Sequence, residues 1–421
     1  MKSAKSKVLH RIAGKPMLLK TIEMLRELNL EQIITVASPQ NLTELKKLLP
    51  SKVDFAVQNK PLGTADAVRV GLETTKANVS NIAVFYGDDT AFYKPQTVLG
   101  VYKNHTDSGA DITFVTIKLK KPQGLGRIVR KNGYIAIVEE KDATEAQKKI
   151  EEVNDGLYIF KKDFLTQNLS KLAPSSVTGE LYITDLIELA NIAGKKISTV
   201  QLESDEWHGI NTQIELAKAN FRHGKNIHIM GISGAGASAV AQIAKSYGFN
   251  VSGCDTNPKS AYSKASVFKI ATGHDRAHIN RDLSCLIVSP AIELYESQNE
   301  EIAEAKKEGL PVITWQEFQG QILQENKFVI AVAGTYGKST TTAMIANILI
   351  DAGLDPTCEV GANVIDWGQN FRPGKSNYLG PQSKGRGPHG PIYICEADEY
   401  NDNFLNYEPN IAVILNAAWD H

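Results

Sequence analysis

The sequence contains few cysteines, and none of them form a closely spaced pair. Its four cysteines (Cys254, Cys285, Cys358 and Cys395) are scattered along 421 residues, without a CxxC motif. This usage excludes a dense disulfide framework. It favours free thiols in a reducing compartment over a cysteine-based metal site.

An excess of charge and long apolar runs are also absent. The sequence contains 46 Lys and Arg residues and 47 Asp and Glu residues, which gives a net charge of -1. This balance argues against nucleic acid or an anionic membrane as the main partner. No uncharged apolar segment is long enough to span a bilayer. The N-terminus is basic, but Gly14, Lys15 and Pro16 interrupt any apolar run, so we expect no signal peptide and a cytoplasmic protein.

Length and composition favour several globular modules. With 421 residues, 42% hydrophobic and 22% charged, the chain is too long for one average core, and we expect two or three domains. Strand-like and helical patterns alternate along the chain, which is typical of the α/β class. We place the modules at residues 1–221, 224–325 and 326–421, with a short polar linker around residue 223.

The most informative single stretch begins the third module. Residues 328–333 predict a buried strand, residues 334–339 a glycine-rich turn, and residues 340–354 a helix. This order forms a phosphate site, because backbone N–H groups and the positive end of the helix face the anion.

Two side chains of this turn suit a nucleotide. Lys338 can reach the terminal phosphates, and Ser339 can offer its hydroxyl to Mg²⁺. Val332 stands where the strict P-loop pattern requires glycine, so only the last part of that motif matches. An ordinary glycine turn in an α/β unit is the alternative.

The first module alternates strands and helices. The strands are predicted at residues 32–37, 53–57, 81–86 and 111–117, and the helices at 18–28, 42–49 and 64–72, the last capped by Thr64. We expect a mostly parallel sheet with helices on both faces and a ligand at the carboxyl ends of its strands. Asp88 follows such an end, where its carboxylate could bind Mg²⁺ or simply form a turn.

Ordered blocks across this module resemble the uridylyltransferase half of bifunctional N-acetylglucosamine-1-phosphate uridyltransferases. The blocks are residues 7–10, 13–17, 62–65, 86–88, 124–128, 138–144, 153–156, 179–185 and 209–211, together with Gln58. The resemblance implies that UTP and N-acetylglucosamine 1-phosphate give UDP-N-acetylglucosamine and pyrophosphate. The alternatives are another sugar-nucleotide pyrophosphorylase and a non-catalytic nucleotide-binding fragment.

The resemblance also implies roles for individual residues. It places the uracil at Gln58, Gly63 and Thr64, and the sugar at Gly126, Glu139 and Asn154. It places Lys7 against the phosphates, and Mg²⁺ at Asp88 and Asn211. A bound metal and a lysine suit this reaction, since positioning and charge neutralisation do most of its work.

This sequence also departs from that family. The family opens with a glycine-rich triphosphate loop ahead of the block at residues 7–10, and it ends in a β-helix of hexapeptide repeats. The sequence begins inside the loop region and contains no such repeat. We therefore expect a truncated chain that releases pyrophosphate only when the loop is restored.

The second module begins like a nucleotide-binding βαβ unit. Strands are predicted at residues 226–230 and 250–254, with a helix at 237–247 between them. Gly231, Gly234 and Gly236 let the backbone approach a diphosphate, and Asp255 can bind a ribose hydroxyl. The spacing does not match GxGxxG, so a generic dinucleotide fold is the alternative.

The end of the third module offers further metal ligands. Glu396 follows a predicted strand at residues 392–395, and His421 lies shortly after one at residues 411–415. Both can bind Mg²⁺ near the phosphate loop, although His421 alone could be an ordinary surface histidine. Residues 371–391, rich in glycine, proline and basic side chains, predict a mobile surface loop.

Together these two modules resemble the Mur ligases, most closely the UDP-N-acetylmuramate–L-alanine ligases. The matching blocks are residues 231–236, 251–255, 289–292, 333–340, 396–399 and 416–421. The resemblance implies that ATP phosphorylates a muramic carboxylate and that L-alanine then displaces phosphate. Tyr336 stands where the family has histidine, which leaves open the related ligase for recycled tripeptides.

This second resemblance also implies site residues and ligands. It assigns ATP to Gly334, Thr335, Gly337, Lys338, Ser339 and Thr340, and the UDP moiety to the loop at 231–236. It assigns Mg²⁺ to Ser339, Glu396 and His421. We expect nucleotide sugars, ATP and UTP as partners, and we do not expect this chain alone to complete the ligation, because the family pattern continues beyond it.

Overall fold

The structure is a computed structural model that describes residues 5–120, 122–131, 133–203, 209–262, 268–295, 299–374 and 391–417. The chain packs into two compact units. The N-terminal unit comprises Ser6–Leu9 and Lys15–Ile210, and the C-terminal unit comprises Met1–Lys5, His10–Gly14 and Asn211–His421.

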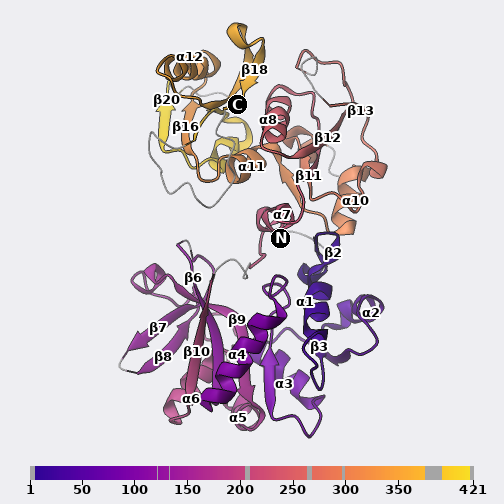
Figure 1. The fold of residues 1–421 in the computed structure, drawn as a ribbon, viewed down its shortest axis with the longest axis vertical. Helices are drawn as coiled ribbons and strands as arrows, with labels where there is room; N and C mark the ends of the chain where they lie inside the picture. Colours follow the sequence, from indigo (N-terminus) through magenta and orange to yellow (C-terminus); the bar gives the residue numbers. More distant parts are fainter. Residues whose placement is uncertain are drawn as a thin grey trace. The chain divides into compact units, whose positions relative to one another are not determined.

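The N-terminal unit alternates strands and helices, as the sequence predicts (Figure 1). Its helices are η1 (Lys7–Leu9), α1 (Met17–Arg26), α2 (Pro39–Leu48), α3 (Thr64–Glu73), α4 (Pro95–Ser108), η2 (Gln147–Lys149), α5 (Lys162–Asn168), η3 (Leu169–Lys171) and α6 (Asp185–Ile192). Its strands are β2 (Lys15–Pro16), β3 (Ile34–Ala37), β4 (Asp54–Val57), β5 (Asn81–Val84), β6 (Ile112–Lys118), β7 (Arg127–Lys131), β8 (Tyr134–Val138), β9 (Glu152–Lys161) and β10 (Ile197–Leu202).

The main sheet of this unit is mixed, so the prediction of a mostly parallel sheet is wrong. Its strand order is β10-β6-β9-β7-β8, and β5 also pairs with β9. Only β10 and β6 pair in parallel; β9 runs antiparallel to β5, β6 and β7. The ten-residue strand β9 inserts between β5 and β6, and the parallel pair β3–β4 forms a separate two-stranded sheet.

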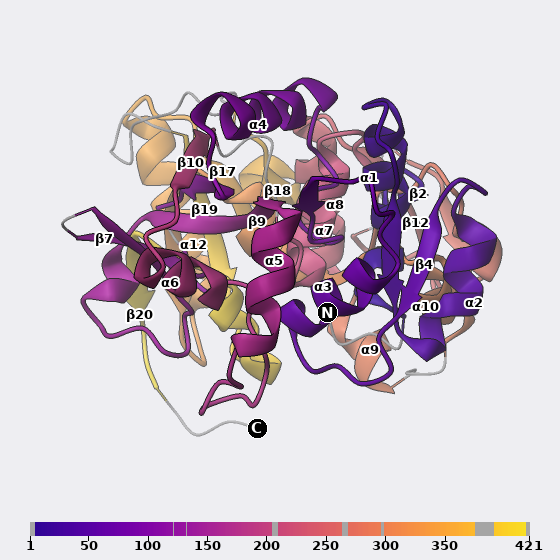
Figure 2. The ribbon, with the colours of Figure 1, turned by 90° about the horizontal axis from the view of Figure 1, so that it is seen from below.

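Helices cover both faces of this sheet, as predicted. Side chains alternate along β6, so that Val115 packs with Val101 of α4 while Phe114 packs with Leu165 of α5 and Leu186 of α6. Figure 2 shows α4 and the pair α5 and α6 on opposite sides of the sheet. The sheet therefore separates two hydrophobic cores.

Helix ends in the structure follow from local sequence. Pro95 opens α4 in its first turn, and Gly109 ends it with a left-handed conformation at φ 64°. Thr212 caps α7 (Gln213–Phe221) through a reciprocal pair of hydrogen bonds with Glu215. The cap of α7 directly follows the candidate metal ligand Asn211.

The C-terminal unit contains two sheets. Its helices are α7, α8 (Ala235–Ser246), η5 (Arg276–His278), α9 (Pro290–Tyr295), α10 (Glu300–Glu308), α11 (Trp315–Phe318), η6 (Gln319–Leu323), α12 (Lys338–Asp351), η7 (Ile365–Trp367) and η8 (Tyr400–Asn406). Its strands are β1 (Arg11–Ile12), β11 (Asn226–Met230), β12 (Asn250–Asp255), β13 (Ile270–Thr272), β14 (Cys285–Val288), β15 (Val312–Thr314), β16 (Phe328–Ala333), β17 (Thr357–Val364), β18 (Gln369–Arg372), β19 (Ile392–Ala397) and β20 (Ile411–Ile414).

Both sheets have the parallel order expected for nucleotide-binding α/β folds. The first runs β13-β12-β11-β14-β15, all parallel. The second runs β18-β17-β19-β16-β20, where only β17 and β18 are antiparallel. Phe371 and Arg372 belong to β18 rather than to the predicted loop, and residues 375–390 of that loop lie outside the described part of the chain.

One hydrophobic core joins the two sheets of this unit. Ile229 and Phe249 share a buried cluster with Val329 and Tyr393. Across the same boundary the Tyr247 hydroxyl lies 2.8 Å from the hydroxyl of Thr357. The segments 224–325 and 326–421 therefore pack as one body, and the domain boundaries drawn from the sequence stay predictions.

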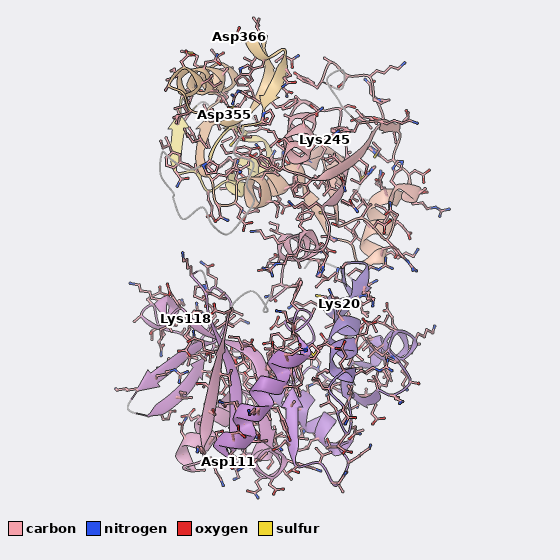
Figure 3. The ribbon with its side chains drawn as sticks, viewed as in Figure 1. Lys20, Asp111, Lys118, Lys245, Asp355 and Asp366 are labelled. Atoms are coloured by element: carbon pink, nitrogen blue, oxygen red, sulfur yellow. The ribbon has the colours of Figure 1, made fainter. Side chains whose placement is uncertain are left out.

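The surface carries charged side chains, and the cysteines are buried. Exposed residues such as Lys118 and Asp366 project from their units (Figure 3). All four cysteines are free and buried, which confirms that they form no disulfide. Among the described residues, no helix is both long and apolar enough to cross a membrane.

Candidate functional site

Lys7 and Asp88 come together beyond the carboxyl end of β5. Asp88 follows this strand after Gly87, and its carboxylate pairs with the Lys7 ammonium group. The two side chains are 30% and 25% exposed, so both remain accessible to a ligand. The structure thus joins the predicted phosphate lysine and the predicted metal ligand in one place.

A tight loop holds the residues predicted to bind uracil. The Gln58 amide donates hydrogen bonds to the carbonyl of Gly63, at 3.1 Å, and to the carboxylate of Asp66, at 2.9 Å. Gly63 has φ +113°, and a Cβ there would lie 2.4 Å from the carbonyl oxygen of Leu181. Only glycine fits this position.

Thr64 does not cap α3, so that prediction is wrong. Gly63 occupies the N-cap position, and Thr64 is the first residue of the helix. The Thr64 hydroxyl instead accepts the backbone N–H of Ile183, at 3.0 Å. This long-range bond uses the oxygen that a capping interaction would need, and it ties the loop to residues 181–183.

The residues predicted to bind the sugar are also adjacent. The Asn154 backbone N–H donates to the carbonyl of Gly126 at 2.9 Å. A Cβ on Gly126 would lie 3.6 Å from each carboxylate oxygen of Glu139. The Thr184 hydroxyl donates to that carboxylate at 3.2 Å, and burial raises the pKa of Glu139.

Tyr86 connects the two groups of residues, a role that the sequence reasoning missed. Its hydroxyl is hydrogen-bonded to the side chain of Thr64, and the negative charge of nearby Glu139 helps to raise the pKa of Tyr86. Gly156, at φ +97°, allows the close approach, since a Cβ there would lie 2.7 Å from the Tyr86 ring. Tyr86 stands beside Gly87 and Asp88 in the sequence, and that adjacency was the available signal.

Asn211 belongs to the C-terminal unit, unlike Asp88. Its backbone N–H donates to the Glu215 carboxylate, at 2.6 Å, in the cap of α7. A shared metal site of Asp88 and Asn211 therefore stays a prediction.

A pocket of about 350 Å³ opens at the carboxyl ends of β11 and β12. The lining residues include Gly231, Gly234 and Asp255, as predicted, together with Ser233, Thr256, Asn257, Ser260, His274, Ser289 and Ile292. Asp255 accepts the backbone N–H groups of Ser233, at 2.9 Å, and Asn257, at 2.8 Å. Its carboxylate thus orders the glycine loop.

Gly236 does not line this pocket. It lies within α8, where a Cβ would be 2.6 Å from the indole ring of Trp315. It allows close packing of the helix, whereas Gly231, at φ +73°, forms the turn itself.

The glycine-rich loop between β16 and α12 has the predicted order of strand, turn and helix. Gly337 is the N-cap of α12 in a left-handed conformation at φ 85°. Asn416 supports the loop, because its amide donates to the Tyr336 carbonyl at 2.9 Å and accepts the Tyr336 N–H at 3.1 Å. The Lys338 ammonium donates to the Gly334 carbonyl at 2.7 Å and pairs with Glu399 at 2.8 Å.

The predicted Mg²⁺ ligands Ser339 and Glu396 contact each other beside this loop. The Glu396 carboxylate is hydrogen-bonded by the Ser339 hydroxyl and the Gly361 N–H, and burial raises its pKa. His421 lies outside the described residues.

Two further predicted residues and one unpredicted residue lie in or near this loop. The predicted ATP residues Thr335 and Thr340 are half-buried and exposed, respectively. Glu359, which the sequence reasoning missed, is fully buried beside Glu396. Its only signal in the sequence is a carboxylate between Cys358 and Val360, in the first half of β17, which is the buried half of that strand.

Glu359 should make the stability of the C-terminal unit depend on pH. Burial and the charge of Glu396 raise the pKa of Glu359 to about 8. Below its ordinary pKa the Glu359 carboxyl is protonated in both the folded and the unfolded protein, and it does not change the free energy of unfolding. As the pH rises toward 8, the carboxyl loses its proton readily only in the unfolded chain. The free energy of unfolding therefore falls over this range. Glu359→Gln should therefore lose less stability than the parent between pH 5 and pH 8.

Denaturant unfolding of both proteins at several pH values measures this difference. Glu300→Gln, at an exposed position at the start of α10, removes the same charge and should keep the parent's pH dependence. Equal slopes for Glu359→Gln and the parent would contradict the prediction.

Two family models match successive parts of the chain. The model of the family "Nucleotidyl transferase" matches residues 2–222, more than half of the 421 residues, and the model "Mur ligase family, catalytic domain" matches residues 226–327. Bifunctional protein GlmU of Thermosipho melanesiensis is 38% identical over 218 residues, 52% of this chain and 46% of that protein.

Two ligases are also similar to part of the chain. UDP-N-acetylmuramate–L-alanine ligase of Clostridium kluyveri is 36% identical over 204 residues, 48% of this chain and 41% of the ligase. The crystal structure of UDP-N-acetylmuramate:L-alanyl-gamma-D-glutamyl-meso-diaminopimelate ligase from Neisseria meningitides is 30% identical, with a TM-score of 0.40, over 47% of this chain and 62% of that one.

The chain spans about half the length of the curated relatives it matches. Its α/β folds, its two family matches and its relatives agree on two enzyme families in one polypeptide. The chain belongs to the nucleotidyl transferase family, and it continues into a Mur ligase domain.

Proposed function

We propose that the N-terminal unit transfers a uridylyl group from UTP to N-acetylglucosamine 1-phosphate. The observation that carries this proposal is the Lys7–Asp88 pair at the carboxyl end of β5. The same unit also holds the loop of Gln58 and Gly63 and the adjacent pair Gly126 and Glu139. A phosphate site with both partner subsites is what such a transfer requires.

The Asp88 carboxylate suits Mg²⁺, which prefers hard oxygen ligands and is usually bound through one or two carboxylates and the substrate phosphates. Mg²⁺, when bound, would neutralise phosphate charge and orient the triphosphate. Lys7 would neutralise further charge on the phosphates. A sugar phosphate oxygen then bonds to the α-phosphorus, the bond from that phosphorus to the bridging oxygen breaks, and pyrophosphate leaves.

We also propose that the C-terminal unit supplies the ATP- and UDP-binding part of a ligase that joins an amino group to the carboxylate of a UDP-muramic acid derivative, with L-alanine as the amine. Lys338 would contact the β- and γ-phosphates of ATP. The hydroxyl of Ser339 and the carboxylate of Glu396 form an oxygen ligand set that suits Mg²⁺. The pocket lined by Gly231 and Asp255 would hold the UDP moiety.

Pyrophosphate release from UTP, Mg²⁺ and N-acetylglucosamine 1-phosphate tests the transferase proposal. We expect turnover that requires both the sugar phosphate and Mg²⁺. Glucose 1-phosphate should give at most about a hundredth of that rate, because Glu139 and Asn154 would select the sugar by hydrogen bonds. A preference for glucose 1-phosphate would show that the sugar assignment is wrong.

A further inference from the structure

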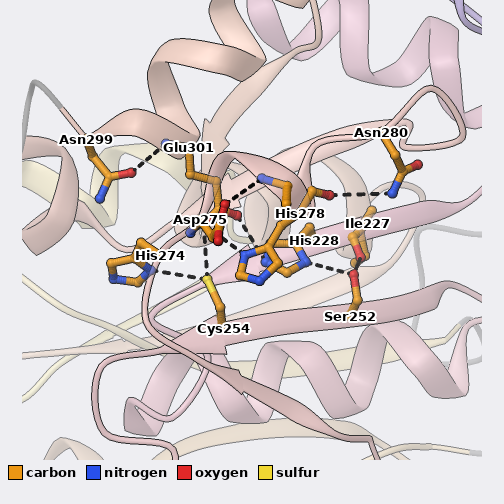
Figure 4. Close-up of polar contacts among 11 residues, drawn as sticks. Ile227, His228, Ser252, Cys254, His274, Asp275, His278, Asn280, Asn299 and Glu301 are labelled. Carbon is orange, nitrogen blue, oxygen red and sulfur yellow. Dashed lines mark hydrogen bonds and ion pairs between the residues drawn. The ribbon is translucent and has the colours of Figure 1, made fainter.

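Four side chains with metal-binding atoms meet in the interior of the C-terminal unit. They are His228 of β11, Cys254 of β12, His278 of η5 and Glu301 of α10, and their ligand atoms all lie within 4.8 Å of one another (Figure 4). His228 is 4% exposed, and Cys254 and Glu301 are fully buried. This cluster takes no part in the phosphate sites proposed above.

We propose that these four residues bind a structural Zn²⁺ ion beneath the UDP pocket. One Glu301 oxygen lies 3.1 Å from His228 Nε2, and the other lies 3.2 Å from His278 Nδ1 and 3.3 Å from Cys254 Sγ. Zn–N and Zn–O bonds of about 2.0–2.1 Å and a Zn–S bond of about 2.3 Å give tetrahedral edges of about 3.3–3.7 Å. The three measured contacts, at 3.1–3.3 Å, are equal to or slightly shorter than these edges, and the four ligand atoms as a set lie within 4.8 Å of one another.

The tautomer of His228 gives a second reason for a cation. The Ser252 hydroxyl donates to the carbonyl of Ile227 at 3.1 Å, so its oxygen must accept from His228 Nδ1, 2.8 Å away. The proton of a neutral imidazole therefore sits on Nδ1, and the lone pair of Nε2 is directed into the cluster.

Nε2 lies 3.1 Å from Oε1 of Glu301, and the two form an ion pair only if the imidazole carries a second proton. Two electron-rich atoms at 3.1 Å repel each other unless a positive charge lies between them. The Nδ1–H···Ser252 bond is also the outer hydrogen bond that orients a metal-bound histidine.

The charge of the cluster balances with zinc. Cys254 would release its proton to solvent on binding, so that a thiolate and a carboxylate neutralise Zn²⁺ while both histidines stay neutral. Sulfur, nitrogen and oxygen ligands together suit Zn²⁺ better than Mg²⁺ or Ca²⁺. Four protein ligands leave no open position, as in structural zinc sites.

The ion would stabilise one wall of the UDP pocket. Cys254 precedes the pocket residue Asp255, and the pocket residue His274 lies 3.1 Å from the Cys254 sulfur through Nδ1. Asp275 donates its backbone N–H to Glu301 at 3.2 Å. A metal at this point would tie the end of β12 to residues 274–278.

Sequence spacing gave only a partial signal for this site. Successive members of the cluster lie 23 to 26 positions apart, and only His278 belongs to an HxxxH pair, with His274. The parallel strands β11 and β12 bring His228 and Cys254 together. A free thiol at Cys254 was therefore expected from the sequence, and the proposal revises that expectation.

Metal analysis of the untagged full chain, expressed with added zinc, tests the proposal. We expect about one Zn²⁺ per chain. Removal by a chelator should lower the melting temperature of the C-terminal unit, and zinc should restore it. Co²⁺ in the metal-free protein should give tetrahedral d–d absorption and a thiolate charge-transfer band.

Variants separate this site from adventitious binding. Cys254→Ser should abolish the charge-transfer band, and Cys254→Ser and His278→Ala should each weaken zinc binding by about 10-fold or more. Cys285→Ser, a buried cysteine of β14 outside the cluster, should retain full zinc. The proposal would be overturned if the parent protein contained no zinc and showed no thiolate band with Co²⁺. It would also be overturned if Cys254→Ser and His278→Ala both bound zinc as tightly as the parent. The cobalt spectra of the parent protein decide the question even if the variants fail to fold.

Discussion

Replacing Asp88 by asparagine is expected to lower pyrophosphate release from UTP by about 10²- to 10³-fold. The substitution keeps the size of the side chain and removes the charge that pairs with Lys7. If that carboxylate holds Mg²⁺ against the triphosphate, its loss acts mainly on the transition state, where charge on the phosphates must be neutralised. The effect should therefore be larger on kcat than on KM for the sugar phosphate.

The stability of the protein should change little in the same variant. A partly exposed ion pair contributes about 0–1 kcal/mol, and both members of this pair are accessible to water. Asp107→Asn, on the exposed surface of α4, removes the same charge and should retain full activity. An Asp88→Asn protein within about threefold of the parent rate would exclude Asp88 from the catalytic machinery.

The parts of the fold that the sequence could predict are those set by local patterns. The strand Phe328–Ala333 matches its prediction from end to end, because a β-branched apolar run followed by glycine has few other solutions. The same holds for Asn226–Met230. Both loops follow their strands directly, so the two phosphate-type loops of the C-terminal unit were predictable as well.

What the sequence could not provide depends on contacts between distant segments. The insertion of β9 between β5 and β6 reverses the expected strand direction, and no local pattern in residues 152–161 encodes it. The local sequence predicts Thr64 as a helix cap, but its hydroxyl accepts a hydrogen bond from the backbone N–H of Ile183, 119 residues later. Glu359 becomes informative only when its complete burial beside Glu396 is known.

Replacing Lys338 by methionine is expected to weaken Mg²⁺–ATP binding to the C-terminal unit by about 100-fold or more. In the structure the ammonium group donates to the Gly334 carbonyl and pairs with Glu399, so it lies over the loop. ATP binding would exchange the Glu399 carboxylate for phosphate oxygens. Methionine keeps the length of the stem but neither attracts phosphate nor supports the loop.

Calorimetric titration with ATP in the presence of Mg²⁺ measures this loss. Lys306→Met, at an exposed position on α10, makes the same charge change and should bind ATP like the parent. ATP affinity within about threefold of the parent would contradict the assignment of Lys338 to the phosphates.

The two substitutions together test whether one polypeptide carries two separate nucleotide sites. Asp88 lies in the N-terminal unit and Lys338 in the C-terminal unit, and each unit has its own hydrophobic cores. Asp88→Asn should therefore leave ATP affinity unchanged, and Lys338→Met should leave pyrophosphate release unchanged. If either substitution altered both measurements, the two sites would have to be energetically coupled. If ATP affinity is unchanged in Asp88→Asn and pyrophosphate release is unchanged in Lys338→Met, each unit binds its nucleotide with its own residues.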